Sequence, residues 1–330
     1  MFNRLRTIVL LTVLILGIIS CKRMPLYEMS KNLRLELTLN LSLDLDIDID
    51  IETDLDIEID NAIVPPTYNK VLFYSPEDNH LVYTEFVGSN GGDISTPSGK
   101  YNMLLYSFGT EYIQIRNEGD INTIEAFTSD ITATKSRALR AASTRVDEDM
   151  PPGPIIYAPD HLLVAKEDVE IPEWAGEDIE ITIKALAKTI VKTYSFEVPN
   201  IKGVEYIESC EAFITNQSRS CFFGRGEISQ EPATLFFPVG VNVKKSCLYT
   251  VFNTFGKLPG ESKSYLHIVI RNTDGTEIYH STVITDQFEK DDHHIVIEDE
   301  IVVPTPTGGG SGIAPTVDKW TEENHDVGIG

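Results

Sequence analysis

The segment Leu33-Arg-Leu-Glu-Leu-Thr-Leu-Asn-Leu-Ser-Leu-Asp-Leu-Asp-Ile-Asp-Ile-Asp-Ile51 places Leu or Ile at every odd position. The alternation resumes at Leu55, Ile57 and Ile59, after a break at Thr53. Side chains two residues apart share one face of a β-strand, so this period predicts strands with one apolar and one polar face. The fold is therefore expected to begin with β-structure.

The second half of this segment is acidic, because every even position from Asp44 to Asp60 is Asp or Glu. Residues 33–60 would extend roughly 90 Å at ~3.3 Å per residue, far beyond an ordinary strand. The segment is thus expected to bend near Thr53 or to protrude from its domain. The acidic face is interpreted as a solvated surface that discourages unwanted strand pairing, with a calcium site as the alternative if a second acidic strand converges on it.

The rest of the chain continues in short β-type runs. Examples are 70–74, 81–87, 101–106 and 112–116 in the first half and 179–186, 190–198, 233–238, 265–271 and 277–284 in the second. Turn clusters separate the runs, and Asp274-Gly275 between two alternating runs is a strong hairpin signal. Even spacing with such punctuation predicts antiparallel sandwiches or barrels.

Composition shifts suggest where the chain divides. A polar, Ala-rich stretch from Ile131 to Asp149 is followed by Pro151-Pro-Gly-Pro, where we place a domain boundary. The predicted divisions are a signal peptide (1–20), a tether (21–32), an N-terminal β-sandwich domain (33–150), a C-terminal β-sandwich domain (151–303), and a Gly-rich linker with a C-terminal strand or tail (304–330).

The start of the chain predicts lipid attachment at Cys21. Arg4 and Arg6 precede an apolar run from Ile8 to Ile19. A helix needs about 20 residues to span a membrane, so this run is too short. The following Ser20-Cys21 resembles a bacterial lipobox, in which the cysteine is acylated by palmitate-like chains after cleavage. An ordinary secretory signal with a chance cysteine is the alternative. Several acyl chains together would hold the protein stably on a membrane.

The charge balance excludes some partners. The chain has 27 basic and 51 acidic residues and a net charge of −24, which argues against nucleic acid and against charge-driven binding to anionic membranes. Cys210, Cys221 and Cys247 leave two alternatives open, one disulfide with a free thiol or three buried thiols.

The common catalytic signatures do not occur in the sequence. His293-His294 beside Asp291-Asp292 is interpreted as a solvated loop, with a metal site as the weaker alternative, since adjacent strand residues point to opposite faces. Trp174 and Trp320 are interpreted as core residues, with sugar stacking as the alternative. We therefore predict no catalytic, cofactor or metal site, and a protein that is not an enzyme.

Several motifs resemble the fimbrillin superfamily of Bacteroidetes, and more closely the lipoprotein anchor and minor subunits of their fimbriae. They are Ala158-Pro-Asp-His-Leu-Leu-Val, Phe236-Phe-Pro-Val, Thr254-Phe-Gly-Lys-Leu-Pro, residues 265–276, Thr282-Val-Ile-Thr-Asp-Gln-Phe, and Cys21-Lys-Arg-Met-Pro-Leu-Tyr. The resemblance implies two tandem transthyretin-like antiparallel β-sandwich domains and an outer-membrane location at the cell surface. It also implies assembly with other fimbrial subunits by β-strand exchange, with no catalytic residues.

Two functions compete at this point. The first is a non-catalytic fimbrial anchor or fimbrial-subunit-like adhesion protein, fixed to outer-membrane lipid through Cys21. The second is a surface glycan-binding lipoprotein of a nutrient-uptake system. The second function predicts a cluster of exposed aromatic side chains on one face.

Overall fold

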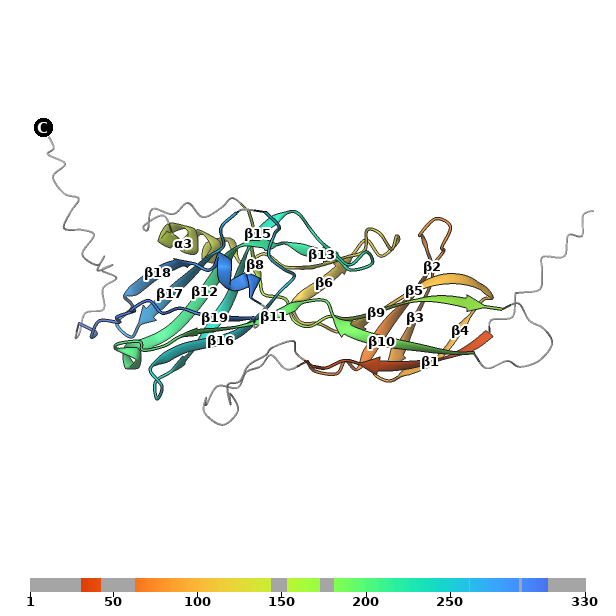
Figure 1. The fold of residues 1–330 in the computed structure, drawn as a ribbon, viewed down its shortest axis with the longest axis horizontal. Coiled ribbons are helices and arrows are strands. Elements are labelled where there is room, and N and C mark those ends of the chain that lie inside the picture. The colour runs from red at the N-terminus through yellow and green to blue at the C-terminus, as the bar shows by residue number, and fades with distance from the viewer. Residues whose placement is uncertain are drawn as a thin grey trace, which may run out of the picture.

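The computed structural model describes residues 31–42, 63–143, 153–172, 181–260, 262–290 and 293–307. Two β regions, a closed barrel and an eight-stranded sheet, lie end to end along the long axis (Figure 1). The predicted all-β class is confirmed. Within the described ranges, no helix has the length and apolar character needed to cross a membrane.

The barrel closes in the strand order β1-β10-β9-β5-β2-β3-β4. Its strands are β1 (Lys31–Leu39), β2 (Tyr68–Tyr74), β3 (Leu81–Gly88), β4 (Gly91–Thr96), β5 (Gly99–Phe108), β9 (Leu163–Ile171) and β10 (Ile181–Thr189). Strand β1 closes it, pairing in parallel with β10 on one edge and antiparallel with β4 on the other. Full closure removes the exposed edges that an open sheet would carry.

The alternating segment behaves as predicted over its first part. Leu33, Leu35 and Leu37 are buried in the barrel core, whereas Arg34 and Glu36 are exposed. Strand β1 ends at Leu39, so the 28-residue segment is not one strand. The whole acidic stretch Asp44–Asp60, with the bend expected at Thr53, lies outside the described residues.

The second sheet has the order β18-β17-β12-β15-β16-β11-β19, with β8 beside β15. Its strands are β8 (Ile155–Tyr157), β11 (Lys192–Val198), β12 (Ile207–Ser218), β15 (Pro232–Asn242), β16 (Cys247–Thr254), β17 (Tyr265–Asn272), β18 (Glu277–Val283) and β19 (His294–Val296). The Asp274-Gly275 hairpin joins β17 to β18, and Gly275 adopts the positive φ of 85° that the turn needs.

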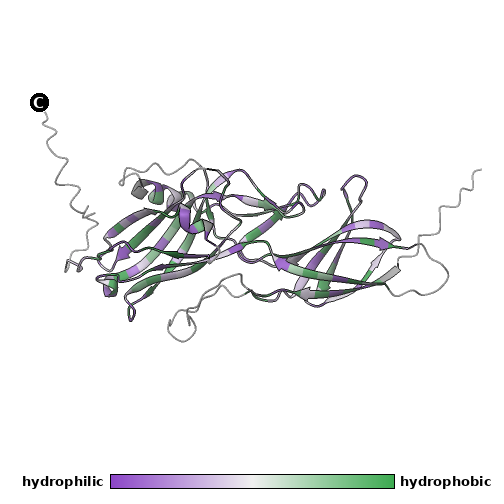
Figure 2. Ribbon diagram, viewed as in Figure 1, coloured by the Kyte–Doolittle hydropathy of each residue, from purple (hydrophilic) through white to green (hydrophobic). Residues whose placement is uncertain are grey.

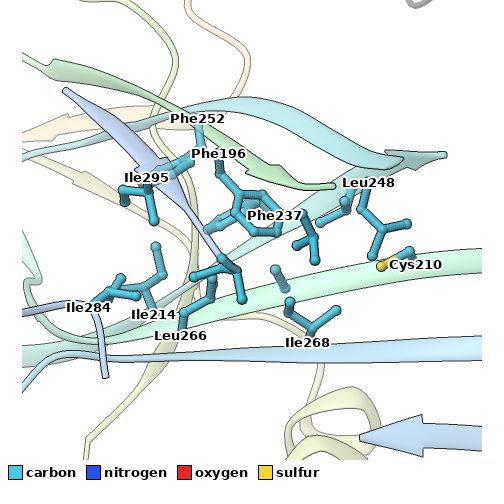
Figure 3. Close-up of a cluster of buried hydrophobic side chains, with 14 of the residues drawn as sticks. Phe196, Cys210, Ile214, Phe237, Leu248, Phe252, Leu266, Ile268, Ile284 and Ile295 are labelled. Atoms are coloured by element: carbon cyan, nitrogen blue, oxygen red, sulfur yellow. The ribbon is translucent and has the colours of Figure 1, made fainter. Parts of the chain in front are cut away.

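The core of the second sheet comes from alternate residues of its strands. Bands of apolar and polar residues alternate along these strands in Figure 2. Phe196, Phe237 and Phe252 meet aliphatic residues of β12 and β17 in one buried cluster (Figure 3). Ile301 and Val303, from the chain after β19, are buried in the same cluster, so the chain belongs to this domain as far as Val303.

A four-stranded sheet and a helix connect the two regions. The small sheet runs β14-β13-β7-β6, formed by β6 (Ile113–Arg116), β7 (Glu125–Thr128), β13 (Ser220–Phe222) and β14 (Glu227–Ile228). It covers the outer face of the barrel through a separate apolar cluster. Helix α3 (Ala133–Ser143) packs its Leu139 against the outer face of the second sheet. Two 3-10 helices, Val204–Tyr206 and Thr285–Glu289, complete the described elements.

Three details differ from the sequence-based expectations. The division between the two β regions does not fall at residue 150, because β9 and β10 return to complete the barrel. The Ala-rich stretch expected as a boundary contains α3. The pairing is not purely antiparallel, since β1 with β10, β8 with β15 and β11 with β19 run in parallel. The first and the third depend on contacts between distant segments, which local periodicity does not record, whereas α3 is a local element in an Ala- and Arg-rich stretch.

Candidate functional site

Strands β15 and β16 separate after a short hairpin, which leaves part of one edge of β16 open. They pair only from Gly240 opposite Tyr249 to Asn242 opposite Cys247. Earlier in β15, residues 234–236 pair with β8 instead. Residues 250–252 of β16 thus pair with β11 on one edge, and no described strand pairs with their other edge.

Pro238 explains why the two strands part. A proline has no backbone N–H, so within sheets it is confined to edges and irregular positions. At Pro238 the contact with β16 is made by a side chain, because the Thr250 hydroxyl donates to the Pro238 carbonyl at 3.1 Å. The sequence therefore ends the β15–β16 ladder at a defined point.

A groove of about 1210 Å³ lies along this open edge, between the barrel and the second sheet. Its walls are residues 64–68 and 107–112 at the barrel, the connection 157–161, and residues 236–240 and 249–253 of the second sheet, with Lys135, Leu163 and Glu211. The groove is therefore built from both β regions.

The wall opposite the sheet is held in place by Asp160. Its carboxylate accepts hydrogen bonds from the backbone N–H groups of Ile113, at 2.9 Å, and Glu111. Between them, the ring of Tyr112 stacks on Tyr157 with centroids 5.7 Å apart. These contacts fix aromatic side chains at the groove without help from a partner.

A charged pair sits at the rim of the groove. The Lys135 ammonium lies 2.7 Å from the Glu211 carboxylate and 3.9 Å from the centroid of the Phe236 ring. The Phe236 ring also meets Tyr157 edge to face at 5.9 Å. The rim thus combines apolar surface with charges that are already paired, which suits recognition of a mixed apolar and polar partner.

Tyr249 is the one groove residue with a buried side-chain oxygen that has no partner among the described residues. Its side chain is 1% exposed and its hydroxyl has no hydrogen-bond partner. Burial, together with the nearby Glu197 carboxylate, raises the pKa of Tyr249 to about 12. A buried, protonated hydroxyl without a partner is a hydrogen-bonding group that an incoming chain or water can satisfy.

The predicted site residues are distributed as follows. Cys21, Trp174 and Trp320 lie outside the described residues, so lipidation at Cys21 stays a prediction. No cluster of His, Cys, Asp and Glu suited to a metal ion occurs in the part of the chain that the structure describes.

The interpretation of His293-His294 as a solvated loop is wrong. His294 begins β19, and its Nδ1 lies 2.6 Å from the Ser195 hydroxyl. The ring of His293 packs on Tyr194 with centroids 4.7 Å apart. Both histidines therefore help to attach β19 to β11.

The three cysteines are buried thiols, as in the second alternative that the sequence left open. Cys210, Cys221 and Cys247 are buried and free. Burial raises the pKa of all three thiols, to about 11 for Cys221. They behave as small apolar core residues rather than as reactive groups.

The sequence-based reasoning did not find the groove, although one signal was present. Pro238 interrupts an otherwise central β-type run, and such a proline marks an edge or an irregular position. The divergence of β15 and β16 depends on β8, a three-residue strand that has too little pattern to predict.

Comparisons with known proteins identify relatives. The family model described as "Domain of unknown function (DUF5119)" matches residues 49–238, more than half of the chain. A candidate fimbrium anchoring subunit of Bacteroides ovatus, Fim4B, is 24% identical over 294 residues, covering 78% of this chain and 83% of that protein. A crystal structure of a candidate adhesin from the same species has a TM-score of 0.55 at 21% identity, covering 87% of this chain and 98% of that one. The predicted resemblance to fimbrial anchor proteins is confirmed.

Proposed function

Since this chain belongs to the DUF5119 family and is related to a candidate fimbrium anchoring subunit, we propose that it is a non-catalytic surface protein that anchors a fimbrium. Its partners in this role are other fimbrial subunits. The transthyretin-like arrangement that the resemblance implies for both β regions stays a prediction. The observation that carries the proposal is the groove along the open edge of β16.

The groove fits an extended segment of a partner subunit. A strand added to an open sheet edge gains main-chain hydrogen bonds, while pockets beside the edge select alternate side chains. Residues 250–252 supply such an edge, and the aromatic side chains of the groove supply apolar contact area. This arrangement supports subunit joining by strand addition at the second sheet.

Attachment to the outer membrane is proposed through acylated Cys21. The support is the lipobox-like sequence and the short apolar run before it. The nine residues from Lys22 to Ser30 separate Cys21 from the start of β1, a reach of at most ~30 Å. The barrel is then the part nearest the membrane, and the second sheet extends away from it (Figure 1).

Two variants test anchoring and joining separately in the native bacterium. Cys21→Ala should release the protein and its fimbriae from the outer membrane into the medium. Val251→Lys places a charge at the open edge and should release fimbriae while the variant itself stays on the membrane. Fimbriae are counted by electron microscopy on cells and in the medium.

The matched control for the groove is Val243→Lys, because Val243 is an exposed valine in the turn between β15 and β16. This variant should retain its fimbriae. Retention of fimbriae by a folded Val251→Lys protein would reject the groove as the joining site. Retention of the Cys21→Ala protein on the membrane at full yield would reject the anchor.

A second candidate function, a surface glycan-binding lipoprotein, is favoured by one observation. Tyr68, Phe86 and Phe108 form a cluster of exposed aromatic side chains on one face of the barrel. Such a cluster is what the sequence-based alternative requires. Tyr68 and Phe108 also line the barrel side of the groove, whereas Phe86 does not, so the two candidate sites adjoin each other.

A further inference from the structure

Three large aromatic side chains are exposed together on the barrel. Tyr68 of β2, Phe86 of β3 and Phe108 of β5, named here the aromatic patch, are 58%, 53% and 54% exposed. Tyr68 lies opposite Phe108 in the β2–β5 ladder, and the rings of Phe86 and Phe108 meet edge to face at 5.7 Å. Contiguous exposed apolar surface of this kind marks interaction sites on soluble proteins.

Strand β2, which lies between the other two strands of the aromatic patch, has no free edge for strand addition. Strand β2 is paired along its length with β3 on one side and β5 on the other, and β5 is paired with β9 on its second edge. The main-chain groups of Tyr68 are thus already used within the barrel, whereas the β5–β9 ladder ends at Tyr106, before Phe108. At β2 a ligand of the aromatic patch is recognised by side chains, whereas the open edge of β16 offers main-chain groups, although Tyr68 and Phe108 line both sites.

A polar cavity adjoins the aromatic patch. It has a volume of about 410 Å³ and is lined by Phe108, Lys70, Ser107, Gln114 and Glu118, among others. This volume is within the range of ~300–1,000 Å³ that is typical of small-molecule sites. An aromatic surface beside a cavity with polar groups suits a ligand that has both an apolar face and hydrogen-bonding groups.

The polar groups of the cavity are fixed in advance. The Lys70 ammonium lies 2.7 and 2.6 Å from the two carboxylate oxygens of Glu118, and the Tyr106 hydroxyl donates to the same carboxylate. The Lys70 nitrogen also lies 5.9 Å from the centroid of the Phe86 ring. A preorganised pair of this kind can add hydrogen bonds to a ligand without first being ordered.

The charges indicate which ligand fits. Among the described residues that line the cavity, Lys70 and Glu118 alone are charged, and they neutralise each other. The whole chain carries a net charge of −24, which disfavours acidic polymers and anionic lipid surfaces. A purely apolar ligand would cover Lys70, Glu118 and Gln114 without bonding them, at a cost in free energy. The ligand should therefore be neutral and rich in hydroxyl groups.

The position of the aromatic patch also argues against membrane insertion. Strand β1 runs along β4 from Lys31, which lies opposite Thr96, to Glu36, which lies opposite Gly91. Gly91 pairs with Gly88 of β3, and Gly88 lies opposite Tyr68. The aromatic patch is thus at the end of the barrel away from residue 31, where the chain arrives from its N-terminus. A surface there faces away from a membrane that holds that terminus.

We propose that the aromatic patch and the adjoining cavity form a binding site for a neutral carbohydrate. Sugar rings lie with their apolar faces against Phe86 and Phe108, and their hydroxyl groups bond to Lys70, Glu118 and Gln114. The site gives the second candidate function a definite location, and it does not depend on the anchoring role.

Affinity gel electrophoresis of the purified full-length chain in detergent tests this site. The probes are neutral polysaccharides (dextran, mannan, galactan and laminarin), with chondroitin sulfate as the acidic comparison. At least one neutral polymer should retard the protein, and the double variant Phe86→Ala, Phe108→Ala should bind it more than tenfold more weakly. Val82→Ala is the matched control, because Val82 is 54% exposed on the same strand and should leave retardation unchanged.

Three results would overturn the proposal. They are no retardation by any neutral polymer in the panel, equal retardation of the folded double variant and the parent protein, and retardation by chondroitin sulfate alone. A parallel flotation assay with phosphatidylcholine vesicles tests whether the aromatic patch binds a lipid surface instead. Flotation that depends on Phe86 and Phe108, without binding to any sugar polymer, would also reject the carbohydrate proposal. None of these results changes the number of fimbriae retained by the Val251→Lys variant, so the two proposals fail independently.

Discussion

The buried carboxylate of Glu125 is held by the guanidinium of Arg116 in a two-point contact, with Nε–Oε2 and Nη2–Oε1 distances of 2.6 and 2.9 Å. Ser220 donates a further hydrogen bond to this carboxylate and so joins β13 to β6 and β7. Although burial alone would raise the pKa of Glu125, the hydrogen bonds from Arg116 and Ser220 hold it below its usual value.

Replacing Glu125 by Gln should therefore destabilise the protein by roughly 1–3 kcal/mol, as measured by urea unfolding at pH 7. Because Arg116 is half-exposed, the expected loss of unfolding free energy is smaller than for a fully buried ion pair. Glu170→Gln is the control, because Glu170 pairs with Lys100 at the surface and should change the free energy of unfolding by less than about 0.5 kcal/mol. Equal losses in both variants would contradict the structural role of Glu125.

Closure of the barrel depends on Gly91. Its φ is +93°, and a Cβ there would lie 2.0 Å from the carbonyl oxygen of Leu35 in β1. Gly91→Ala should cost at least ~3 kcal/mol in free energy of unfolding, from backbone strain and from displacement of β1. Gly109 has a similar φ of +97° with no atom near its Cβ position, so Gly109→Ala should cost only about 1 kcal/mol. Similar melting temperatures for the two variants would show that β1 accommodates the methyl group.

His267 makes the protein sensitive to mild acid. Its ring is buried against Phe213 and next to Tyr279, and burial lowers its pKa to about 4 from a usual 6.5. In the unfolded chain His267 binds a proton more readily than in the native state. The stability that the native protein gains from keeping this ring neutral is therefore complete above pH 6.5 and is lost as the pH falls toward 4. Between pH 7.5 and pH 5 the free energy of unfolding should fall by about 2 kcal/mol through this residue.

The variant His267→Phe isolates this effect from the carboxylates that titrate in the same range. The difference in unfolding free energy between pH 7.5 and pH 5 should be smaller in the variant by that amount. An identical pH dependence of the two proteins would mean that the ring is protonated at little cost in the native state.

The C-terminal segment should divide into a structural part and a dispensable part. Ile301 and Val303 are buried, and Val302 pairs with Lys202, whereas Thr305 and Thr307 are exposed. Ile301→Ala should cost about 2–4 kcal/mol. Deletion from Thr305 onward should lower the free energy of unfolding by less than about 1 kcal/mol, because the described hydrogen bonds that it removes are those of Thr307 to Asp274 at the surface. Global unfolding after that deletion would place a strand of the second sheet within the deleted residues.

Local pattern predicted the strands that are apolar runs between turn residues and missed a strand that is rich in buried polar residues. The runs at 70–74, 101–106 and 265–271 became β2, β5 and β17, because short apolar runs bounded by turn residues are typical of strands, including strands buried on both faces such as β2 and β5. Strand β12, with twelve residues, was not predicted, since its second half is buried on both faces and carries polar residues such as Thr215 and Gln217 that bond internally. The groove and the aromatic patch arise from which strands become neighbours, and one sequence does not contain that information.

The closing strand of the barrel has a mechanical consequence. Strand β1 is clamped on both edges, with seven residue pairs to β10 and six to β4. A pull on the chain ahead of Lys31 acts along the axis of this strand, at right angles to its hydrogen bonds. Both ladders are then loaded in shear and must yield together, whereas a strand peeled from one end would lose its bonds one at a time. A fimbrium under tension would thus load the barrel in its most resistant direction.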